Sequence, residues 1–203
     1  MRDLVLLVPD KNTEATIRGA LVRHQALGIR QIDCHILVEQ DRDGGVRCRG
    51  AQVLNVVRGQ YSYAAMIMDY EGSGANVAPA KLEAQLDGAL STSWGDHCKA
   101  IVIEPEVDVW MWGSETHLRS TMDWEFDEDI RSWLENQGFA FGENGKPVRP
   151  KEALEAAFRR ANVPRSSARY EYVAQRLSLV NCTDAAFQRL RSALVTWFGA
   201  AVR

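Results

Sequence analysis

The first 112 residues alternate between short apolar runs and amphipathic segments, and this alternation constrains the fold more than any other feature. Apolar runs with the length and composition of strands lie at 4–8, 32–38, 63–68 and 100–103. Segments with helical spacing separate them, at 13–27, 51–57 and 79–90. Strands that alternate with helices favour a mostly parallel sheet with right-handed crossovers. The sequence therefore predicts an α/β fold with a sheet flanked by helices.

After residue 106 the strand signals stop. Short helices are expected at 107–112 and 127–137, and a turn-rich stretch, GFAFGENGKPVRP, then precedes three further helices predicted at 151–161, 166–177 and 184–198. We therefore divide the chain into an α/β domain, residues 1–145, and a basic helical extension, residues 146–203.

Charge is distributed unevenly between these two parts. Residues 1–145 carry 13 Lys and Arg against 23 Asp and Glu, a net charge of -10, and residues 146–203 carry 11 against 4, a net of +7, which sum to -3. A basic module on an acidic body indicates an anionic partner such as nucleic acid or a nucleotide, another protein, or attraction between the two parts of the chain.

Composition excludes several classes of protein. A chain of 203 residues with 46% hydrophobic content can bury a sizeable core. No apolar stretch approaches the roughly 20 residues that span a bilayer, and the N-terminus lacks the features of a signal peptide. We therefore expect a cytoplasmic protein with no membrane partner. The four cysteines lack metal-ligand spacing and are interpreted as reduced structural thiols.

Acidic side chains follow three of the predicted strands. They come from the segments VPDKNTE, MDYEGSG and IEPEVD, which supply Asp10 and Glu14, Asp69 and Glu71, and Glu104, Glu106 and Asp108. The carboxyl ends of parallel strands meet at one edge of a sheet, where ligands bind in α/β proteins. Carboxylate oxygens are the ligands that Mg²⁺ prefers, and one or two of them suffice together with water and phosphate.

Each of these acids also has a structural interpretation. Asp10 suits the N-cap of the first helix, Asp69 precedes a glycine-rich turn, and Glu104 before a proline suits a strand end that faces water. Acids gathered at one edge repel one another, so we expect a metal ion, Lys11 or an arginine from the extension among them.

The segment NVPRSSAR places serines at the start of a predicted helix among several arginines. Free amides at a helix N-terminus bind phosphate, and arginine adds bidentate hydrogen bonding. The candidate phosphate-binding residues are Lys11, Lys151, Arg160, Arg165, Ser166 and Arg169. The alternatives are a serine cap with solvated arginines, or arginines that neutralise the acidic edge. Of Trp110 and Trp112, which face different sides of a helix, one is expected to pack on the sheet and the other to be free to stack on a base, a partner or the extension.

Six segments together resemble the small TOPRIM-like proteins of the bacterial methylation-associated defence system. They are LVPDKNTEATIRGAL, MDYEGSG, VIEPEVDVWMW, RPKEALEAAFRRA, PRSSARYEYVAQRLSL and CTDAAFQRLRSAL. The likeness covers nearly the whole chain and rests on the order of the segments. It implies a TOPRIM/Rossmann-like sheet, a role in anti-phage defence beside a DNA methyltransferase, and other defence-system proteins as partners.

The chain departs from active TOPRIM domains, which place a glutamate directly after the first strand and an Asp-x-Asp after a later one. Here these positions hold Pro9 or Asp10 and the pair Asp69-x-Glu71. The first hypothesis is therefore a non-catalytic subunit of a defence system that binds nucleic acid or protein, or regulates a partner. The alternative is a Mg²⁺-dependent nuclease or other phosphoryl-transfer enzyme. Its catalytic residues would be Glu14, Asp69, Glu71 and Glu104, and its metal ligands Asp10, Asp69, Glu71 and Glu106.

Overall fold

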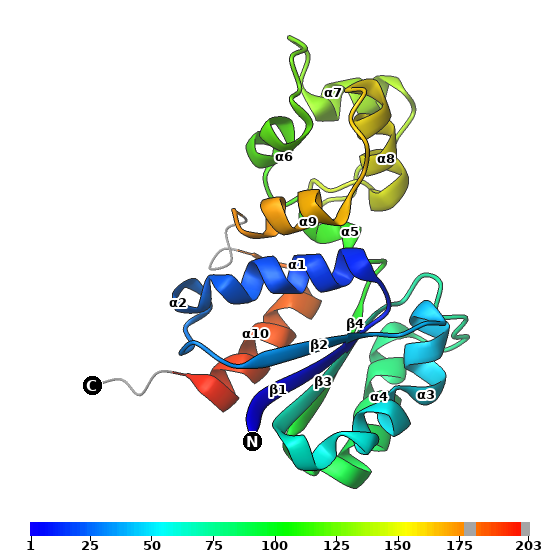
Figure 1. The fold of residues 1–203 in the computed structure, drawn as a ribbon. Coiled ribbons are helices and arrows are strands. Elements are labelled where there is room, and N and C mark those ends of the chain that lie inside the picture. Colours follow the sequence, from blue (N-terminus) through cyan, green and yellow to red (C-terminus); the bar gives the residue numbers. More distant parts are fainter. Residues whose placement is uncertain (177–181, 200–203) are drawn as a thin grey trace.

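The computed structural model describes residues 1–176 and 182–199, and a four-stranded sheet forms its centre (Figure 1). The strands are β1 (Arg2–Val8), β2 (Cys34–Val38), β3 (Tyr61–Asp69) and β4 (Cys98–Ile103). They lie in the order β2-β1-β3-β4, and every neighbouring pair is parallel. The predicted α/β fold with a parallel sheet is therefore confirmed. The run Leu4 to Val8 is buried on both faces, as expected for a central parallel strand.

Helices cover both faces of the sheet. On one face lie α1 (Lys11–Val22), the short α2 (His24–Leu27) and α10 (Ala185–Phe198), and on the other lie α3 (Arg42–Val56), a short 3₁₀ turn (Arg58–Gln60) and α4 (Pro79–Trp94). Two hydrophobic cores result, one on each face. The sheet therefore has helices on both sides, which leaves its carboxyl edge for a site.

Helix α3 is much longer than the predicted segment at 51–57. Its first half contains glycines and charged residues, which gave no apolar period. Tertiary packing forms the helix instead: Val46 and Leu54 are fully buried, and Gly50 allows the helix to approach the sheet closely. A Cβ atom on Gly50 would lie only 3.3 Å from Cδ2 of Leu7.

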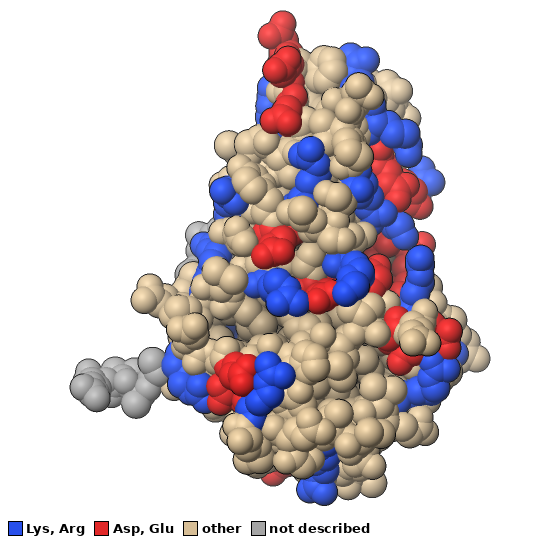
Figure 2. Space-filling model, viewed as in Figure 1, with Lys and Arg blue, Asp and Glu red and all other residues tan. Residues whose placement is uncertain are grey.

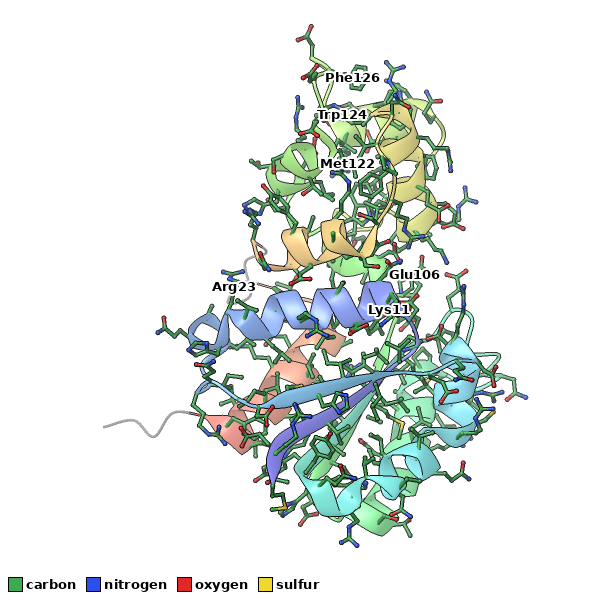
Figure 3. The ribbon with its side chains drawn as sticks, in the orientation of Figure 1. Lys11, Arg23, Glu106, Met122, Trp124 and Phe126 are labelled. Atoms are coloured by element: carbon green, nitrogen blue, oxygen red, sulfur yellow. The ribbon has the colours of Figure 1, made fainter. Side chains whose placement is uncertain are left out.

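In the described part of the chain, five helices between β4 and α10 form a lobe above α1 and the carboxyl edge of the sheet (Figure 1), which we call the helical lobe. They are α5 (Asp108–Met111), α6 (Glu115–Met122), α7 (Ile130–Asn136), α8 (Pro150–Arg160) and α9 (Ser167–Ala174), and α9 packs along α1. Figure 3 shows Met122, Trp124 and Phe126 inside this lobe. Helix α6 was not among the predicted helices, and Ser114 caps it by accepting the backbone N–H of His117.

The three helices predicted after residue 146 are confirmed as α8, α9 and α10, although residue 177 of the expected 166–177 lies outside the described residues. They do not pack as one unit. Helices α8 and α9 belong to the lobe, whereas α10 returns to the sheet and packs on β4. One hydrophobic core contains residues from both sides of position 145. The division of the chain at residue 145 stays a prediction.

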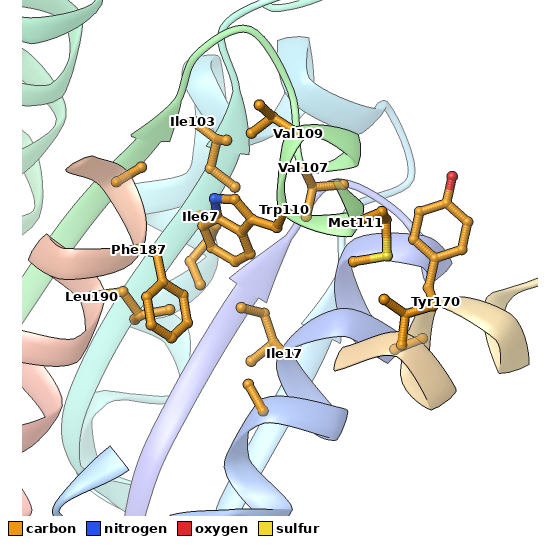
Figure 4. Close-up of a cluster of buried hydrophobic side chains, with 14 of the residues drawn as sticks. Ile17, Ile67, Ile103, Val107, Val109, Trp110, Met111, Tyr170, Phe187 and Leu190 are labelled. Carbon is orange, nitrogen blue, oxygen red and sulfur yellow. The ribbon is translucent and has the colours of Figure 1, made fainter. Parts of the chain in front are cut away.

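Trp110 ties the lobe to the sheet (Figure 4). Its side chain is 2% exposed, its ring meets Phe187 edge-on at 5.4 Å, and its Nε1 donates to Oδ1 of Asp184 at 2.9 Å. Trp112 is half-buried and donates through Nε1 to the carbonyl oxygen of Pro150 at 3.0 Å. Both tryptophans are thus engaged within the protein: Trp110 packs on the sheet, and Trp112 hydrogen-bonds Pro150 of the extension, one of the three partners expected for the second tryptophan. In the described part of the chain, no helix has the length and apolarity to cross a bilayer.

Candidate functional site

A hollow of about 460 Å³ opens between the carboxyl ends of the strands, the start of α3 and the start of α8. We call it the acidic pocket, because the charged side chains that line it, among the residues that the structure describes, are nine carboxylates, from Asp10, Asp41, Asp43, Asp69, Glu71, Glu106, Asp108, Glu152 and Glu155, and two cations, from Arg42 and Lys151. Figure 3 shows Glu106 at the junction between the lobe and the sheet, with Lys11 close to it in the view.

Three strand ends and one helix start deliver the central acids. Asp10 follows β1 and caps α1, because its Oδ1 accepts the backbone N–H groups of Asn12 and Thr13 at 2.9 and 2.8 Å. Asp69 is the last residue of β3, and Asp43 lies in the first turn of α3, which follows β2. Since β1 lies between β2 and β3, the strand order itself brings these three side chains to one place.

Asp69 is the most buried acid in the pocket, and backbone contacts fix its position. Its Oδ1 accepts the N–H of Val107 at 2.8 Å, and its own N–H donates to Oδ1 of Asp43 at 2.7 Å. Burial raises the pKa of Asp69 well above its ordinary value, and the charge of Asp43 raises it further. The end of β3, the start of α3 and the start of the lobe are therefore linked through two neighbouring aspartates.

Crowding holds other carboxyls in the pocket partly protonated. Burial is the main reason that the pKa of Asp43 is raised to about 6, and the nearby Asp10 adds to this effect. Burial, followed by the charge of Asp108, raises the pKa of Glu106 to about 7, against the opposing effect of Lys151. The pocket thus concentrates negative charge beyond what its own cations neutralise, and a bound cation would relieve it.

A second group of charges closes the back of the pocket. Arg165 lies between Asp108 and Glu155, with nitrogen-oxygen distances of 3.0 and 2.8 Å, and the Tyr170 hydroxyl donates to Oδ1 of Asp108. Burial raises the pKa of Asp108 above its ordinary value, although Arg165 counteracts this. We call Asp108, Glu155, Arg165 and Tyr170 the lobe brace, because they join α5, α8 and α9.

The four predicted metal ligands, Asp10, Asp69, Glu71 and Glu106, all line the acidic pocket. Two predicted catalytic residues do not. Glu14 is not a lining residue, and its carboxylate pairs with Lys11 and Arg18, each at 2.7 Å. Glu104 is exposed and lines a separate hollow between α4 and α10. Glu14 lies about one helical turn beyond Asp10, the N-cap of α1, and is therefore displaced from the strand end. Glu104 follows β4, which is the outermost strand of the sheet.

The predicted phosphate-binding residues are spread over the molecule rather than gathered. Lys151 lines the pocket, and its Nζ lies 3.9 Å from Oε2 of Glu106. Arg160 stacks over the ring of Phe126 at 4.3 Å. Ser166 and Arg169 line a different hollow, of about 450 Å³, where Arg169 donates to the carbonyl oxygen of Thr121. Arg165 belongs to the lobe brace, and Lys11 pairs with Glu14.

Sequence reasoning missed Asp41 and Asp43, which line the pocket after β2. A signal was present, because the segment VEQDRDGG follows the predicted strand at 32–38 just as the other acidic segments follow theirs. Ligands bind at the carboxyl ends of parallel strands, and the same argument applied to the strand at 32–38 would have included Asp41 and Asp43.

The donor set fits a hard divalent cation, although not as a closed cage. In the described ranges 1–176 and 182–199, no three acidic, histidine or cysteine side chains converge on one point. Mg²⁺ does not need such a cage, since it keeps several waters and binds one or two carboxylates together with phosphate oxygens. The buried carboxylate of Asp69, with its raised pKa, is the observation in this structure that favours a cation.

We expect the free energy of unfolding to fall as the pH rises from about 5 to about 8. The folded-state pKa values of Asp43, about 6, and Glu106, about 7, exceed those of free carboxyls, so the folded protein holds protons that the unfolded chain has released. Raising the pH removes these protons and leaves uncompensated charge. Urea denaturation across this range measures the slope.

Glu106→Gln should flatten part of that slope, and Glu104→Gln is the matched control because its carboxyl is exposed and lies outside the acidic pocket. Equal slopes for wild type and Glu106→Gln would contradict the assigned crowding.

Comparison with known proteins supports the fold. No protein-family model matches the chain, and no curated protein sequence matches it. Among solved structures, the chain is similar to the C-terminal region of the Burkholderia pseudomallei OLD protein, with a TM-score of 0.55 and 11% sequence identity. The match covers 96% of this chain and 97% of that one, so the likeness extends over sheet and lobe together. At this identity it shows the fold alone, and the fold is TOPRIM-like.

Proposed function

We propose that the acidic pocket is a Mg²⁺-dependent site that cleaves phosphodiester bonds, and that the chain is a nuclease-type protein. The observation that carries this proposal is that Asp10, Asp69 and Glu71 all line the acidic pocket at the carboxyl edge of the sheet. These acids lie close to the positions at which active TOPRIM enzymes hold theirs, and the similarity to an OLD protein supports the proposal. The position directly after β1, where active TOPRIM domains place a glutamate, holds Pro9, and Asp10 comes one residue later.

The metal would be held by one or two of Asp10, Asp69, Glu71 and Glu106, with water and phosphate oxygens completing its coordination. Bound there, Mg²⁺ supplies charge for the phosphate and a water of lowered pKa. The protein contributes a fixed donor at Asp69, which Val107 orients through its N–H. Lys151, at the rim, places a positive charge where a phosphate would approach.

We expect Mg²⁺ or Mn²⁺ to raise the melting temperature of the wild type and to support cleavage of DNA or RNA. Asp69→Asn should abolish both effects, because it removes the buried carboxylate while it keeps the shape of the side chain. Without metal, the same variant should melt at a higher temperature than wild type at pH 8, since it removes a crowded buried charge. Loss of the metal response would then not reflect unfolding.

Glu104→Gln is the matched control for this experiment and should behave as wild type, because Glu104 lies outside the acidic pocket. Cleavage that persists in Asp69→Asn, or a metal response that it leaves unchanged, would count against the proposal.

A second function is favoured by the contacts of the predicted phosphate-binding lysine and arginine side chains, which are made within the protein itself. Lys11, Arg160, Arg165 and Arg169 each contact a group of the protein itself, which leaves few of the expected cations for a nucleic-acid backbone. In this function the chain is a non-catalytic binding or regulatory subunit of a bacterial anti-phage defence system, of the methylation-associated kind, and acts through other defence proteins. Intact folding, no cleavage with any divalent metal, and capture of a neighbouring defence protein would identify it.

A further inference from the structure

The two edges of the sheet differ in how their backbone groups are satisfied. Edge strands expose rows of N–H and C=O groups, which proteins commonly protect with charged side chains, covering elements or bulges. In a parallel strand, alternate residues direct these groups toward the neighbour and away from it. The pairing partners therefore tell which residues of β2 and β4 face outward.

The edge of β4 is closed by side chains. His97 and Ile103 bond to β3 through their carbonyl oxygens, so Cys98, Ala100 and Val102 face outward. Asp87 accepts the N–H of Ala100 at 2.6 Å. Glu83 accepts the N–H of Val102 at 2.8 Å, and Arg189 of α10 donates to the Val102 carbonyl oxygen at 3.1 Å. No strand can add here without displacing these contacts.

The edge of β2 is open. Asp33 and Glu39 bond to β1, so Cys34, Ile36 and Val38 direct their N–H and C=O groups outward. In the described part of the chain, no recorded side-chain hydrogen bond reaches the backbone of these three residues, and all of β2 is partly exposed. The strand sequence, CHILV, contains no lysine, proline or acid. No helix lies in front of β2 in Figure 1, and Figure 2 shows an uncharged surface there, with charged groups toward its two ends.

We propose that β2 pairs antiparallel with β2 of a second copy of this chain, about a two-fold axis at Ile36. In this register Ile36 faces its own counterpart, and Cys34 faces Val38 of the second copy. Each outward N–H then meets an outward C=O, because the outward residues are spaced symmetrically about Ile36. A shift of two residues would leave part of each strand unpaired. The sheet would continue through both copies, as in strand addition at other open edges.

The side chains beside β2 fit this occupant. A groove of about 300 Å³ runs between α1 and β2, with Leu21, Val22, Ile32, Cys34 and Ile36 among its lining residues. Val22 is 62% exposed at this groove. Paired residues of neighbouring strands place their side chains on the same face of a sheet. The second copy's Ile36 and Val38 would therefore lie beside this groove.

The charges at the ends of β2 also fit a second copy. The register brings Asp33 opposite Glu39 of the other chain. Each acid is already neutralised in its own chain, Asp33 by Arg2 at 2.9 Å and Glu39 by Arg49 at 2.5 Å. The two ion pairs meet with balanced charge, so each arginine lies near an acid of the other copy.

The test measures the mass of the purified full chain by sedimentation at several concentrations. Wild type should be a dimer that dissociates on dilution. Ile36→Pro removes an outward N–H that makes no bond within the chain, so the strand keeps its pairing with β1 while dimerisation weakens roughly 10- to 100-fold. Ile36→Ala is the matched control: it shortens the same side chain but keeps the N–H, and it should dimerise more tightly than Ile36→Pro.

Cross-linking provides a second readout that does not depend on Ile36→Pro folding. In the proposed register His35 faces Leu37 of the second copy in a close, non-hydrogen-bonded pair. The double variant His35→Cys and Leu37→Cys should form a disulfide-linked dimer on mild oxidation, whereas either single variant should not form this link. A wild type that stays monomeric at every concentration, a dimer unaffected by Ile36→Pro, or a double variant without cross-links would each overturn the proposal. A monomer would leave the edge to a strand of another protein.

Discussion

Replacement of Arg165 by methionine is expected to lower the free energy of unfolding by about 3 kcal/mol at pH 8, because it leaves Asp108 buried without its cation. Arg165 contacts Asp108, Glu155 and the Tyr170 hydroxyl, and the Asp108 side chain is almost fully buried. The loss should be smaller at pH 5. Without Arg165 the folded-state pKa of Asp108 rises further, so lowering the pH protonates this acid in the folded protein and restores stability.

Arg159→Met is the matched control for this substitution. Arg159 lies on α8, the helix that carries Glu155, its side chain is exposed, and it reaches Glu155 only at 4.0 Å, so its removal should change the free energy by less than about 0.5 kcal/mol. Denaturant titration at both pH values measures each variant. Equal stabilities for Arg165→Met and wild type would contradict the stabilising role of Arg165 and would favour the phosphate-binding role that the sequence predicts.

Trp110→Ala is expected to cost about 3 to 5 kcal/mol, because it empties a buried site between the lobe, the sheet and α10. The indole packs on Phe187 and hydrogen-bonds Asp184, which also caps α10 by accepting the N–H of Phe187 at 3.0 Å. The substitution therefore removes apolar contact and loosens the start of the helix that returns the chain to the sheet. Loss of cooperativity in the unfolding curve should accompany the loss of stability.

Trp110→Phe separates packing from hydrogen bonding. It keeps most of the apolar contact but loses the bond to Asp184, so it should cost about 1 to 2 kcal/mol. Trp112→Ala provides the comparison at a half-buried position, where a smaller effect is expected. An equal effect at positions 110 and 112 would contradict the central place assigned to Trp110.

The sheet could be predicted from the sequence because its strands are apolar on both faces. Leu4 to Val8 and Ile101 to Ile103 are continuous apolar runs, and they are buried as such runs require. Helix α3 could not be delimited in the same way, since its first half depends on contacts made by other elements. A glycine at position 50 lets the helix lie close to Leu7 and Met66, and this packing offsets the low helix propensity of glycine. The residues next to Gly50 in the sequence do not indicate this contact.

The order and direction of the strands explain why most of the predicted acids line one pocket. The position of Glu14 depends instead on which side of helix α1 it occupies. Asp10 and Asp69 meet because their strands are adjacent and parallel. Glu14 does not join them, since Lys11 and Arg18 flank it one turn away on either side of the helix. That spacing, three and four residues, was visible in the sequence and indicates a solvated ion-pair row. The lobe brace was not predictable, because it joins residues up to 62 positions apart.

The closed edge at β4 determines how far assembly can proceed. A sheet with two open edges can accept a neighbour on each side, and growth by repeated addition has no natural end, which leads to fibres. With Glu83, Asp87 and Arg189 occupying one edge, only the other remains, and a pair formed there has no edge left over. These three side chains therefore limit assembly to a finite particle, and one of them, Arg189, lies far along the chain from both edge strands.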